Sequence, residues 1–268
     1  MTDVPHPWAS RAAGDVRRVA TVPLSEVDFA IRSEAETVAT GVRWEAHAHE
    51  VHELLWSTRG VLSVRTGRRL WALPAGAGVW IPAGTEHHAH AGEGSGYRAV
   101  YLAPTACPAI DDDAVPVAVD PALRELLGLL DGSELPADVR GRVERLAIDL
   151  LALARREEGT LAELLVPDDP RIREIAAAVV ADPGDRTGLA QWARRVGQSE
   201  RTIARAFREA TGLSFREWRT TVRVHCAMAL LVEGMPVHRV AALIGYETSS
   251  AFVAAFRRAT GMTPGSLR

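Results

Sequence analysis

One pattern occurs twice near the end of the sequence: Leu189-Ala-Gln-Trp-Ala-Arg-Arg-Val-Gly197 with Ser199-Glu-Arg-Thr-Ile-Ala-Arg-Ala-Phe-Arg-Glu-Ala-Thr-Gly212, and Val237-His-Arg-Val-Ala-Ala-Leu-Ile-Gly245 with Thr248-Ser-Ser-Ala-Phe-Val-Ala-Ala-Phe-Arg-Arg-Ala-Thr-Gly261. Each copy has a short helical segment, a glycine, a Ser or Thr that can cap a helix, and a longer amphipathic segment that ends in Thr-Gly. A glycine in the turn lets two helices meet at a steep angle. The repeat therefore predicts two helix-turn-helix units, each with a second helix that can enter a major groove of DNA.

The second helix of each unit supplies the candidate contacts to DNA. In the first copy the apolar positions form one stripe and leave Arg201, Thr202 and Arg205 outside it. Arginine pairs with guanine through two hydrogen bonds, which is worth about 1–3 kcal/mol of discrimination. Arg208, farther along the helix, is better placed for phosphates. The predicted DNA-binding residues are Ser199, Arg201, Thr202, Arg205, Arg208, Ser249, Ser250 and Arg257.

The second copy carries shorter side chains on the same face. Ser249, Ser250, Val253 and Ala254 precede the first long side chain, Arg257. We therefore expect weak direct base readout from this helix and more readout of phosphates or DNA shape. A solvated helix face would also carry arginines. The repeat and the local charge favour DNA, because residues 168–268 hold 15 arginines against 10 acidic residues, although the whole chain has a net charge of −3.

Composition limits the other classes of protein. The chain has 268 residues, of which 47% are hydrophobic and 24% charged, as in soluble globular proteins of one large or two ordinary domains. We expect no membrane partner, because no apolar run approaches the ~20 residues that span a bilayer. The N-terminus does not follow the pattern of a secretory signal. Cys107 and Cys226 fall in different predicted domains, so a disulfide is not expected. These features predict a cytoplasmic protein.

Changes of pattern along the chain predict its domains. Residues 1–30 are rich in proline and small polar residues and are expected to be poorly structured. Short apolar runs broken by glycine then predict a β-barrel over residues 31–110. Helical periodicity predicts a linking segment over 120–166, with one helix from Pro136 to about Glu158. The fold class is thus an all-β barrel, linking helices and an all-α tandem helix-turn-helix domain over 168–268.

Two stretches of the barrel region contain histidine and glutamate, residue types that commonly ligate metals. They read Gly41-x5-His47-x-His49-x3-Glu53-x6-Gly60 and Gly76-x5-Pro82-x-Gly84-x2-His87. Residues two apart on a strand share a face, so His47 and His49 are expected to project together, and Glu53 keeps their parity if the strand continues without a bulge. His87 would come from a later strand. Three imidazoles and a carboxylate suit divalent Fe, Mn, Ni, Cu or Zn. Trp44, Trp56, Trp71 and Trp80 are expected in the barrel core.

Both regions resemble known families. The two barrel stretches resemble the two motifs of the cupin superfamily, which implies His47, His49, Glu53 and His87 as metal ligands; the last position of the second motif, usually asparagine, is Ala91 here. Residues 170–268 resemble the DNA-binding domain of AraC/XylS transcription regulators, including the linker helix between the two units. That resemblance implies two recognition helices in successive major grooves of double-stranded DNA. The usual C-terminal aromatic residue of the family is replaced by Leu267.

Two functions compete at this point. One is a sequence-specific transcription regulator whose cupin domain senses a metal ion or a small-molecule effector. The other is a metal-dependent cupin enzyme, such as a dioxygenase or isomerase, in which DNA binding is secondary. A site with open coordination positions serves either. The repeat favours the regulator, because an enzyme has no need of two groove-reading helices, so we do not expect an enzyme. The resemblance also implies a homodimer joined through the helices of residues 121–158.

Overall fold

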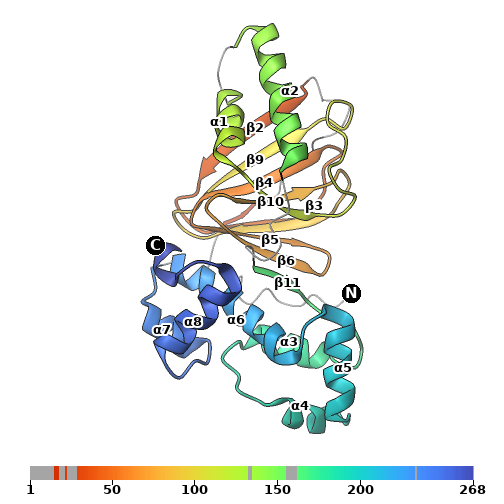
Figure 1. The fold of residues 1–268 in the computed structure, drawn as a ribbon, viewed down its shortest axis with the longest axis vertical. Coiled ribbons are helices and arrows are strands. Elements are labelled where there is room, and N and C mark those ends of the chain that lie inside the picture. Colours follow the sequence, from red (N-terminus) through yellow and green to blue (C-terminus); the bar gives the residue numbers. More distant parts are fainter. Residues whose placement is uncertain are drawn as a thin grey trace. The chain divides into compact units, whose positions relative to one another are not determined.

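The computed structural model describes residues 15–17, 22, 29–131, 135–154, 162–232 and 234–267 (Figure 1). They form two compact units. The first contains Gly14–Gly67 and Leu73–Leu161, and the second contains Arg68–Ala72 and Ala162–Arg268. Most of the segment 1–30, which we expected to be poorly structured, lies outside the described residues. Within it, Asp15–Arg17 form a short strand, β1.

The first unit is built from two β-sheets. One sheet has the order β10-β7-β4-β9-β2, and the other contains the order β1-β3-β8-β5. Neighbouring strands are antiparallel, except that β1 runs parallel to β3. Gly60, with φ 74°, makes the tight turn between β4 and β5. The strands are β1 (Asp15–Arg17), β2 (Ile31–Thr37), β3 (Val42–His47), β4 (His52–Arg59), β5 (Val61–Thr66), β7 (Ala77–Ile81), β8 (His87–Ala91), β9 (Gly96–Leu102) and β10 (Val115–Ala118).

Tryptophans fill the interior, as the sequence predicts. Trp56 and Trp80 are buried in one cluster with residues of β2, β9 and β10. Trp44 is 7% exposed at the inner wall of the barrel unit. Trp71, which the sequence also assigns to the barrel core, is buried but belongs to the second unit. The expected barrel-like, two-sheet domain is therefore confirmed, and large aromatic side chains supply much of its buried apolar surface.

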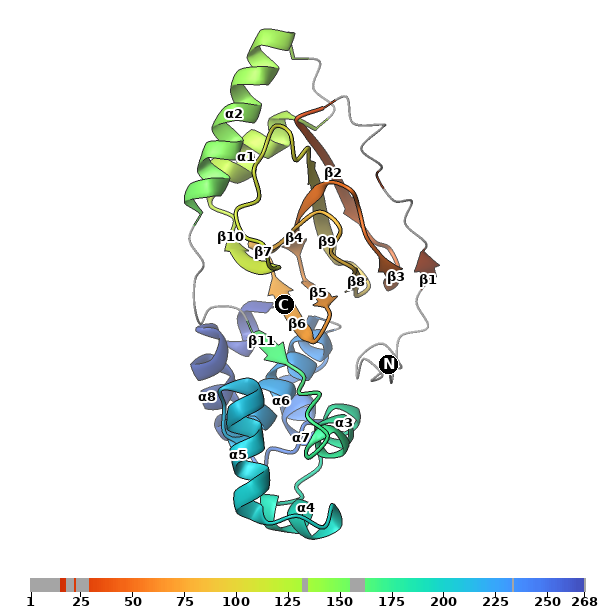
Figure 2. The same cartoon turned by 90° about the vertical axis from the view of Figure 1, so that its right-hand side faces the viewer.

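Two helices cover one side of this core (Figure 2). Helix α1 (Pro121–Leu129) begins at Asp120, whose carboxylate accepts a hydrogen bond of 2.9 Å from the amide of Leu123. Helix α2 (Ala137–Leu153) buries Ala147 and Leu151 in the same cluster. The sequence predicts this helix as far as Glu158, but residues 155–161 lie outside the described part.

The second unit is mainly helical. Its helices are α3 (Arg173–Ala181), α4 (Leu189–Arg195), α5 (Glu200–Thr211), α6 (Phe215–Val232), α7 (Val237–Leu243) and α8 (Ser249–Thr260), followed by a 3-10 turn (Pro264–Leu267). It also contains β11 (Ala162–Leu165), which pairs with residues 69–72 of β6 (Arg69–Pro74). The helical periodicity assigned to 120–166 does not predict β11. Its edge is anchored where Trp218 Nε1 donates a 2.8 Å hydrogen bond to the carbonyl of Leu165.

The two helix-turn-helix units are confirmed in their details. Ser199 and Thr248 cap α5 and α8, because each side-chain oxygen accepts a hydrogen bond from a backbone amide three residues later. Both helices end at a glycine with positive φ, 73° at Gly212 and 72° at Gly261. No helix in the described ranges is long and apolar enough to cross a membrane.

Candidate metal centre and nucleic-acid interface

Four side chains of the barrel unit converge from three strands and a loop. His47 is the last residue of β3, Glu53 lies in β4, and His87 begins β8. His49 lies between β3 and β4. The structure thus brings together the four predicted ligands, but not along one continuous strand. The register shifts between Trp44 and His47, and the chain turns after β3, so strand parity does not explain why His47 and Glu53 meet.

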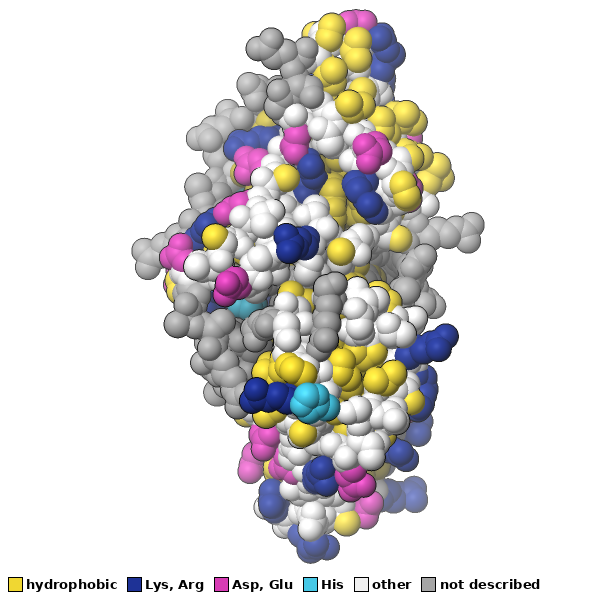
Figure 3. Space-filling model, turned by 90° about the vertical axis from the view of Figure 1, so that its left-hand side faces the viewer, with side chains coloured by type: hydrophobic (Ala, Val, Ile, Leu, Met, Phe, Trp, Pro, Cys, Tyr) yellow, Lys and Arg dark blue, Asp and Glu magenta, His cyan; other side chains and the backbone are white. Residues whose placement is uncertain are grey.

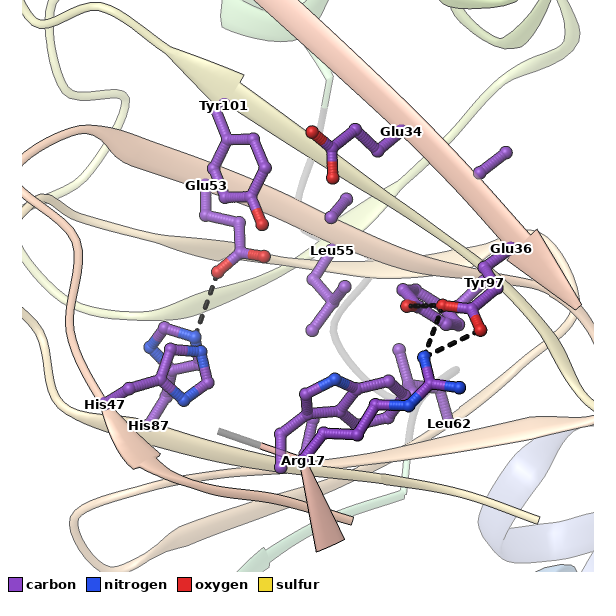
Figure 4. Close-up of a pocket in the computed structure, with 14 residues that line it drawn as sticks. Arg17, Glu34, Glu36, His47, Glu53, Leu55, Leu62, His87, Tyr97 and Tyr101 are labelled. Carbon is purple, nitrogen blue, oxygen red and sulfur yellow. Dashed lines mark hydrogen bonds and ion pairs between the residues drawn. The ribbon is translucent and has the colours of Figure 1, made fainter. Parts of the chain in front are cut away.

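The distances within this cluster are short, and Figure 4 shows His47, Glu53 and His87 pointing toward one another. One ring nitrogen from each of His47, His49 and His87 lies within 4.8 Å of the others. Glu53 Oε2 lies 3.0 Å from His87 Nε2 and 4.0 Å from His49 Nε2. The side chains of His49, Glu53 and His87 are at most 5% exposed. A divalent ion could therefore be reached by all four side chains after small movements, in surroundings that exclude most water.

Backbone carbonyls orient two of the imidazoles. His47 Nδ1 lies 2.7 Å from the carbonyl oxygen of Glu45, and His87 Nδ1 lies 3.0 Å from that of Thr85. A carbonyl can only accept, so in each ring Nδ1 carries a proton and donates it. Nε2 is then the atom that each ring would offer to a metal, in His87 only after loss of the proton that it shares with Glu53. This is the outer support that metal-binding histidines usually have.

His49 has a different hydrogen bond. The backbone amide of Val22 donates to His49 Nδ1 at 3.1 Å. Nδ1 is therefore unprotonated, and in the neutral ring the proton sits on Nε2. That Nε2 atom is buried and has no hydrogen-bond partner among the described residues. A metal could bind Nε2 only after the proton leaves that atom. In the neutral ring the proton then sits on Nδ1, and a protonated Nδ1 can no longer accept the hydrogen bond from the amide of Val22.

The charges of the cluster follow from burial and from one ion pair. Burial lowers the pKa of His49 to about 4 and, with the charge of His87, lowers that of His47. These two rings are neutral near pH 7. Burial opposes the charges of Glu53 and His87, but their mutual hydrogen bond outweighs it, so the pKa of Glu53 is lowered and that of His87 is raised. Without a metal, the Glu53–His87 pair holds a proton that metal ligation would displace.

Three residues of the cluster, His47, Glu53 and His87, line one end of a cavity of about 380 Å³. Across the cavity from His47 and His87, Arg17 contacts both carboxylate oxygens of Glu36, at 2.7 and 2.8 Å, and the Tyr97 hydroxyl donates to the same carboxylate at 2.6 Å (Figure 4). Trp44, Leu55 and Leu62 supply apolar wall between the two polar ends. The cavity therefore suits a small molecule with an apolar body.

Sequence reasoning missed Arg17, Glu36, Tyr97 and Tyr101, all of which line this cavity. Tyr97 and Tyr101 lie four apart on β9, so the alternation of a strand could have placed them on one face. Arg17 gave no signal, because it belongs to a segment that we expected to be poorly structured. Burial and the neighbouring carboxylate of Glu53 raise the pKa of Tyr101, so its hydroxyl stays protonated.

The remaining barrel histidines stay outside the cluster. Among them, His52 and His90 are buried. His52 Nδ1 accepts a 3.0 Å hydrogen bond from the amide of Ala83, and its ring lies 4.9 Å from that of Trp80. His90 lies opposite Arg43 in the ladder of β3 and β8. These two are structural residues of the barrel wall.

Helix α5 carries most of the predicted DNA contacts. Ile203, Ala206 and Phe207 are buried, and Arg201, Arg205 and Arg208 are exposed on the outside. Arg205 lies 3.4 Å from Glu209, which also receives Arg171 at 2.8 Å. Thr202 is half-buried and shares a 2.8 Å hydrogen bond with the cap, Ser199. The arginines are thus available to a partner, and Glu209 steadies one of them.

Helix α8 presents its predicted contacts on a different kind of surface. Phe252, Phe256 and Thr260 are fully buried, and Ser250 and Arg257 are exposed. Ser249 is half-buried at the start of the helix. An open depression follows the outer face and is lined by Ser249, Ser250, Val253, Ala254, Arg257 and Arg258. Both recognition helices therefore expose the faces that the sequence assigns to DNA, with arginines on α5 and small side chains on α8.

Comparison with known proteins supports two successive modules. Residues 35–165 match the AraC-like ligand binding domain, and residues 192–268 match a helix-turn-helix domain. The chain is 28% identical over 239 residues to the HTH-type transcriptional regulator NimR of Escherichia coli. This match covers 89% of this chain and 86% of NimR. It is 32% identical over 224 residues to the HTH-type transcriptional regulator RipA of Corynebacterium glutamicum, covering 79% of this chain and 60% of RipA.

Solved structures give lower overall similarity. ToxT of Vibrio cholerae is 11% identical with a TM-score of 0.37, covering 89% of this chain and 97% of ToxT. The C-terminal domain of AraT of Geobacillus stearothermophilus is 26% identical with a TM-score of 0.36, covering 37% of this chain and 84% of that domain. The family assignment rests on the sequence matches and on the two helix-turn-helix units. Together they show that the chain belongs to the AraC family of DNA-binding transcription regulators, with an AraC-like ligand-binding domain in front of its helix-turn-helix domain.

Proposed function

We propose that this protein is a sequence-specific transcription regulator whose barrel unit senses a divalent transition metal, or a small molecule that binds to that metal. The observation that carries the proposal is the convergence of His47, His49, Glu53 and His87, of which His47, Glu53 and His87 line one end of a cavity. His47 and His87 donate from Nδ1 to carbonyls, so Nε2 is the atom that each would offer to an ion, in His87 after loss of the proton shared with Glu53, and the buried Nε2 of His49 lacks a hydrogen-bond partner in the described structure. The residues present therefore fit a metal of the Fe, Mn, Ni, Cu or Zn type.

The cavity indicates how an effector would reach the ion. Four protein ligands leave coordination positions open on an octahedral metal. The apolar wall of Trp44, Leu55 and Leu62 extends from the cluster, and Tyr101 lies beside Glu53 (Figure 4). A small molecule with one donor atom and an apolar body would bind the metal through the donor and bury the body in the cavity. The Arg17–Glu36 pair would close the opposite end without a net charge.

The metal part of this proposal is tested by elemental analysis of the purified protein. We expect about one divalent transition metal per chain, after expression or after reconstitution with Fe, Mn, Ni, Cu or Zn. The double variant His47→Ala, His49→Ala should lose the metal but keep operator binding by the second unit. His90→Ala is a matched control, because it also removes a buried barrel histidine, and it should keep the metal. Wild-type protein that takes up none of the five metals would contradict the proposal.

We also propose a homodimer joined through α2. The helix packs part of its apolar stripe on its own barrel, because Ala147 and Leu151 are buried there and Val143 and Leu150 pack beside them. Leu146 and Leu153 remain 49% and 74% exposed. They are seven residues apart and thus on one face of the helix, the spacing of a seam that pairs with a second helix. Hydrophobic side chains gather over the part of the barrel unit that contains α2 (Figure 3).

A second copy of the same helix is the occupant that this face fits best. A twofold axis brings an identical strip of leucines against itself, so the surface is self-complementary without any other partner. Opposite charges flank the strip on α2, with Arg142 3.0 Å from Asp138 and Arg140 3.0 Å from Glu144. Two protomers would present four recognition helices to one operator.

A further inference from the structure

The two recognition helices, α5 and α8, have the same fold but expose different side chains. Aligned from cap to C-terminal glycine, each position of α5 corresponds to the position 49 residues later in α8. Arg201 then corresponds to Ser250, and Arg205 to Ala254. The caps and the buried faces are alike in both helices, so the backbones present the same outward positions. What differs is the reach of the side chains at those positions.

The first two turns of α8 expose only small groups. Ser250 and Ala254 are exposed, and Val253 is half-buried between them on the outer face. These residues line the depression described above, whose far end carries Arg257 and Arg258. Side chains this short let the helix backbone approach closely whatever lies against it. The arginines enter only after two turns and can meet phosphates there.

Methyl groups in a major groove recognise one base in particular. Thymine alone among the four bases presents a methyl group, at C5, and apolar side chains contact it. Serine hydroxyls accept from or donate to several bases and discriminate less. The outer face of α8 therefore carries the methyl groups of Val253 and Ala254, which could contact the C5-methyl group of thymine. The outer face of α5 has guanidinium groups, whose partner is the N7 and O6 edge of guanine.

We propose that Val253 and Ala254 determine the specificity of α8 by packing against thymine C5-methyl groups, so that the DNA segment bound by each protomer has one half read through thymine methyls and one half read through guanine. This inference rests on the proposed DNA-binding function. It replaces the expectation of weak base readout at α8 by a defined apolar contact. The two halves of the site bound by one protomer would then differ in sequence preference, although the two helix-turn-helix units have the same fold.

Base analogues test this directly. A binding site is selected from random DNA with the full-length protein, and its thymines are replaced one at a time by deoxyuridine, which removes only the C5-methyl group. We expect about a four-fold loss of affinity at one or two positions in one half, equal to about 0.8 kcal/mol for one buried carbon. Replacement of guanines by 7-deazaguanine should weaken binding in the other half only.

Variants of α8 test which residues cause the loss of affinity on deoxyuridine substitution. Val253→Ala should bind the selected site more weakly, and the penalty for deoxyuridine at one position should disappear in this variant. Val237→Ala, a half-buried valine on α7, should retain the full penalty. Ala254→Arg places on α8 the arginine that α5 has at Arg205. It should select guanine at one position where the wild type selects thymine.

Two results would overturn the inference while the proposed function stands. One is a selected site in which deoxyuridine is neutral at every thymine and 7-deazaguanine weakens both halves. The other is an unchanged deoxyuridine penalty in Val253→Ala. Failure to enrich any sequence from the random DNA would instead contradict the proposed function itself, and this inference with it.

Discussion

His49 is the cluster residue whose backbone hydrogen bond would have to change if a metal bound its Nε2. Its Nδ1 accepts the amide proton of Val22, so ligation through Nε2 and this hydrogen bond exclude each other. Glu50 also holds Val22, since its amide donates to the carbonyl of Val22 at 3.1 Å. Metal binding should therefore displace the backbone at Val22 from His49. Of the three imidazoles, only His47 could then bind a metal without exchanging a partner, because His87 Nε2 lies 3.0 Å from Glu53 and His49 accepts from Val22.

The first prediction follows from that exchange. Val22→Pro removes the amide proton, so binding of a metal no longer costs a hydrogen bond, whose net value is about 0.5–1.5 kcal/mol. We expect metal affinity to rise by about two- to ten-fold, measured by titration against a competing chelator. Val22→Ala keeps the amide and is the control for loss of the side chain. Equal affinities in Val22→Pro, Val22→Ala and the wild type would show that the hydrogen bond does not compete with the metal.

Arg205 carries the second prediction at this scale. Its side chain is 63% exposed and is steadied by Glu209 at 3.4 Å. Arg205→Ala should weaken binding to the selected operator by about 1–3 kcal/mol and relax specificity at one position in one half. The measurement is a titration of labelled DNA at fixed salt, because phosphate contacts change with salt. Arg124→Ala removes an exposed arginine of the barrel unit and should change nothing. Unchanged selectivity in Arg205→Ala would remove this residue from the reading face.

Among the elements, repeated and capped helices were the easiest to predict from the sequence. The spacing of Gly197 and Ser199, and of Gly245 and Thr248, determines both turns locally, so periodicity and capping suffice. The strand β11 could not be predicted in this way, because its four residues become a strand only through pairing with β6. Whether such a short segment becomes a strand depends on tertiary pairing, which no local sequence pattern shows.

The metal cluster could be predicted in part. Motif spacing identified all four residues that converge. The parity expected for Glu53 required a strand that continues without a bulge, and that condition is not met, because β3 ends at His47 and Glu53 lies in β4. The far wall of the cavity was not predicted. Arg17 reaches it through the parallel pairing of β1 with β3, which joins residues 27 apart in the chain. Long-range pairing of this kind leaves no local signal in the sequence.

Helix α2 carries the third prediction. Leu150 packs beside the barrel core, so a charge there would disturb the fold. Leu146 and Leu153 are exposed, and Leu146→Glu with Leu153→Glu should leave the fold intact while separating the dimer. Sedimentation at micromolar concentration should show a wild-type dimer and a variant monomer. Leu243→Glu, an exposed leucine of α7, should remain dimeric. A wild-type protein that is monomeric with and without DNA would exclude the dimer.

The whole molecule combines two kinds of chemistry in one chain. The barrel unit offers nitrogen and oxygen ligands in a buried cluster, and the helical unit offers two groove-sized helices on which arginines and methyl groups are exposed. A metal or effector changes DNA binding only if it binds two arrangements of the protein with different affinity. Couplings of this kind are usually worth about 5- to 150-fold in affinity.

The affinity of the full-length protein for its selected operator, with and without metal, tests the central claim most directly. We predict a change of at least about five-fold on metal loading in the wild type and in His90→Ala. The His47→Ala, His49→Ala variant should show one affinity under both conditions. Wild-type protein that holds one metal per chain and binds the operator equally well without it would contradict metal sensing.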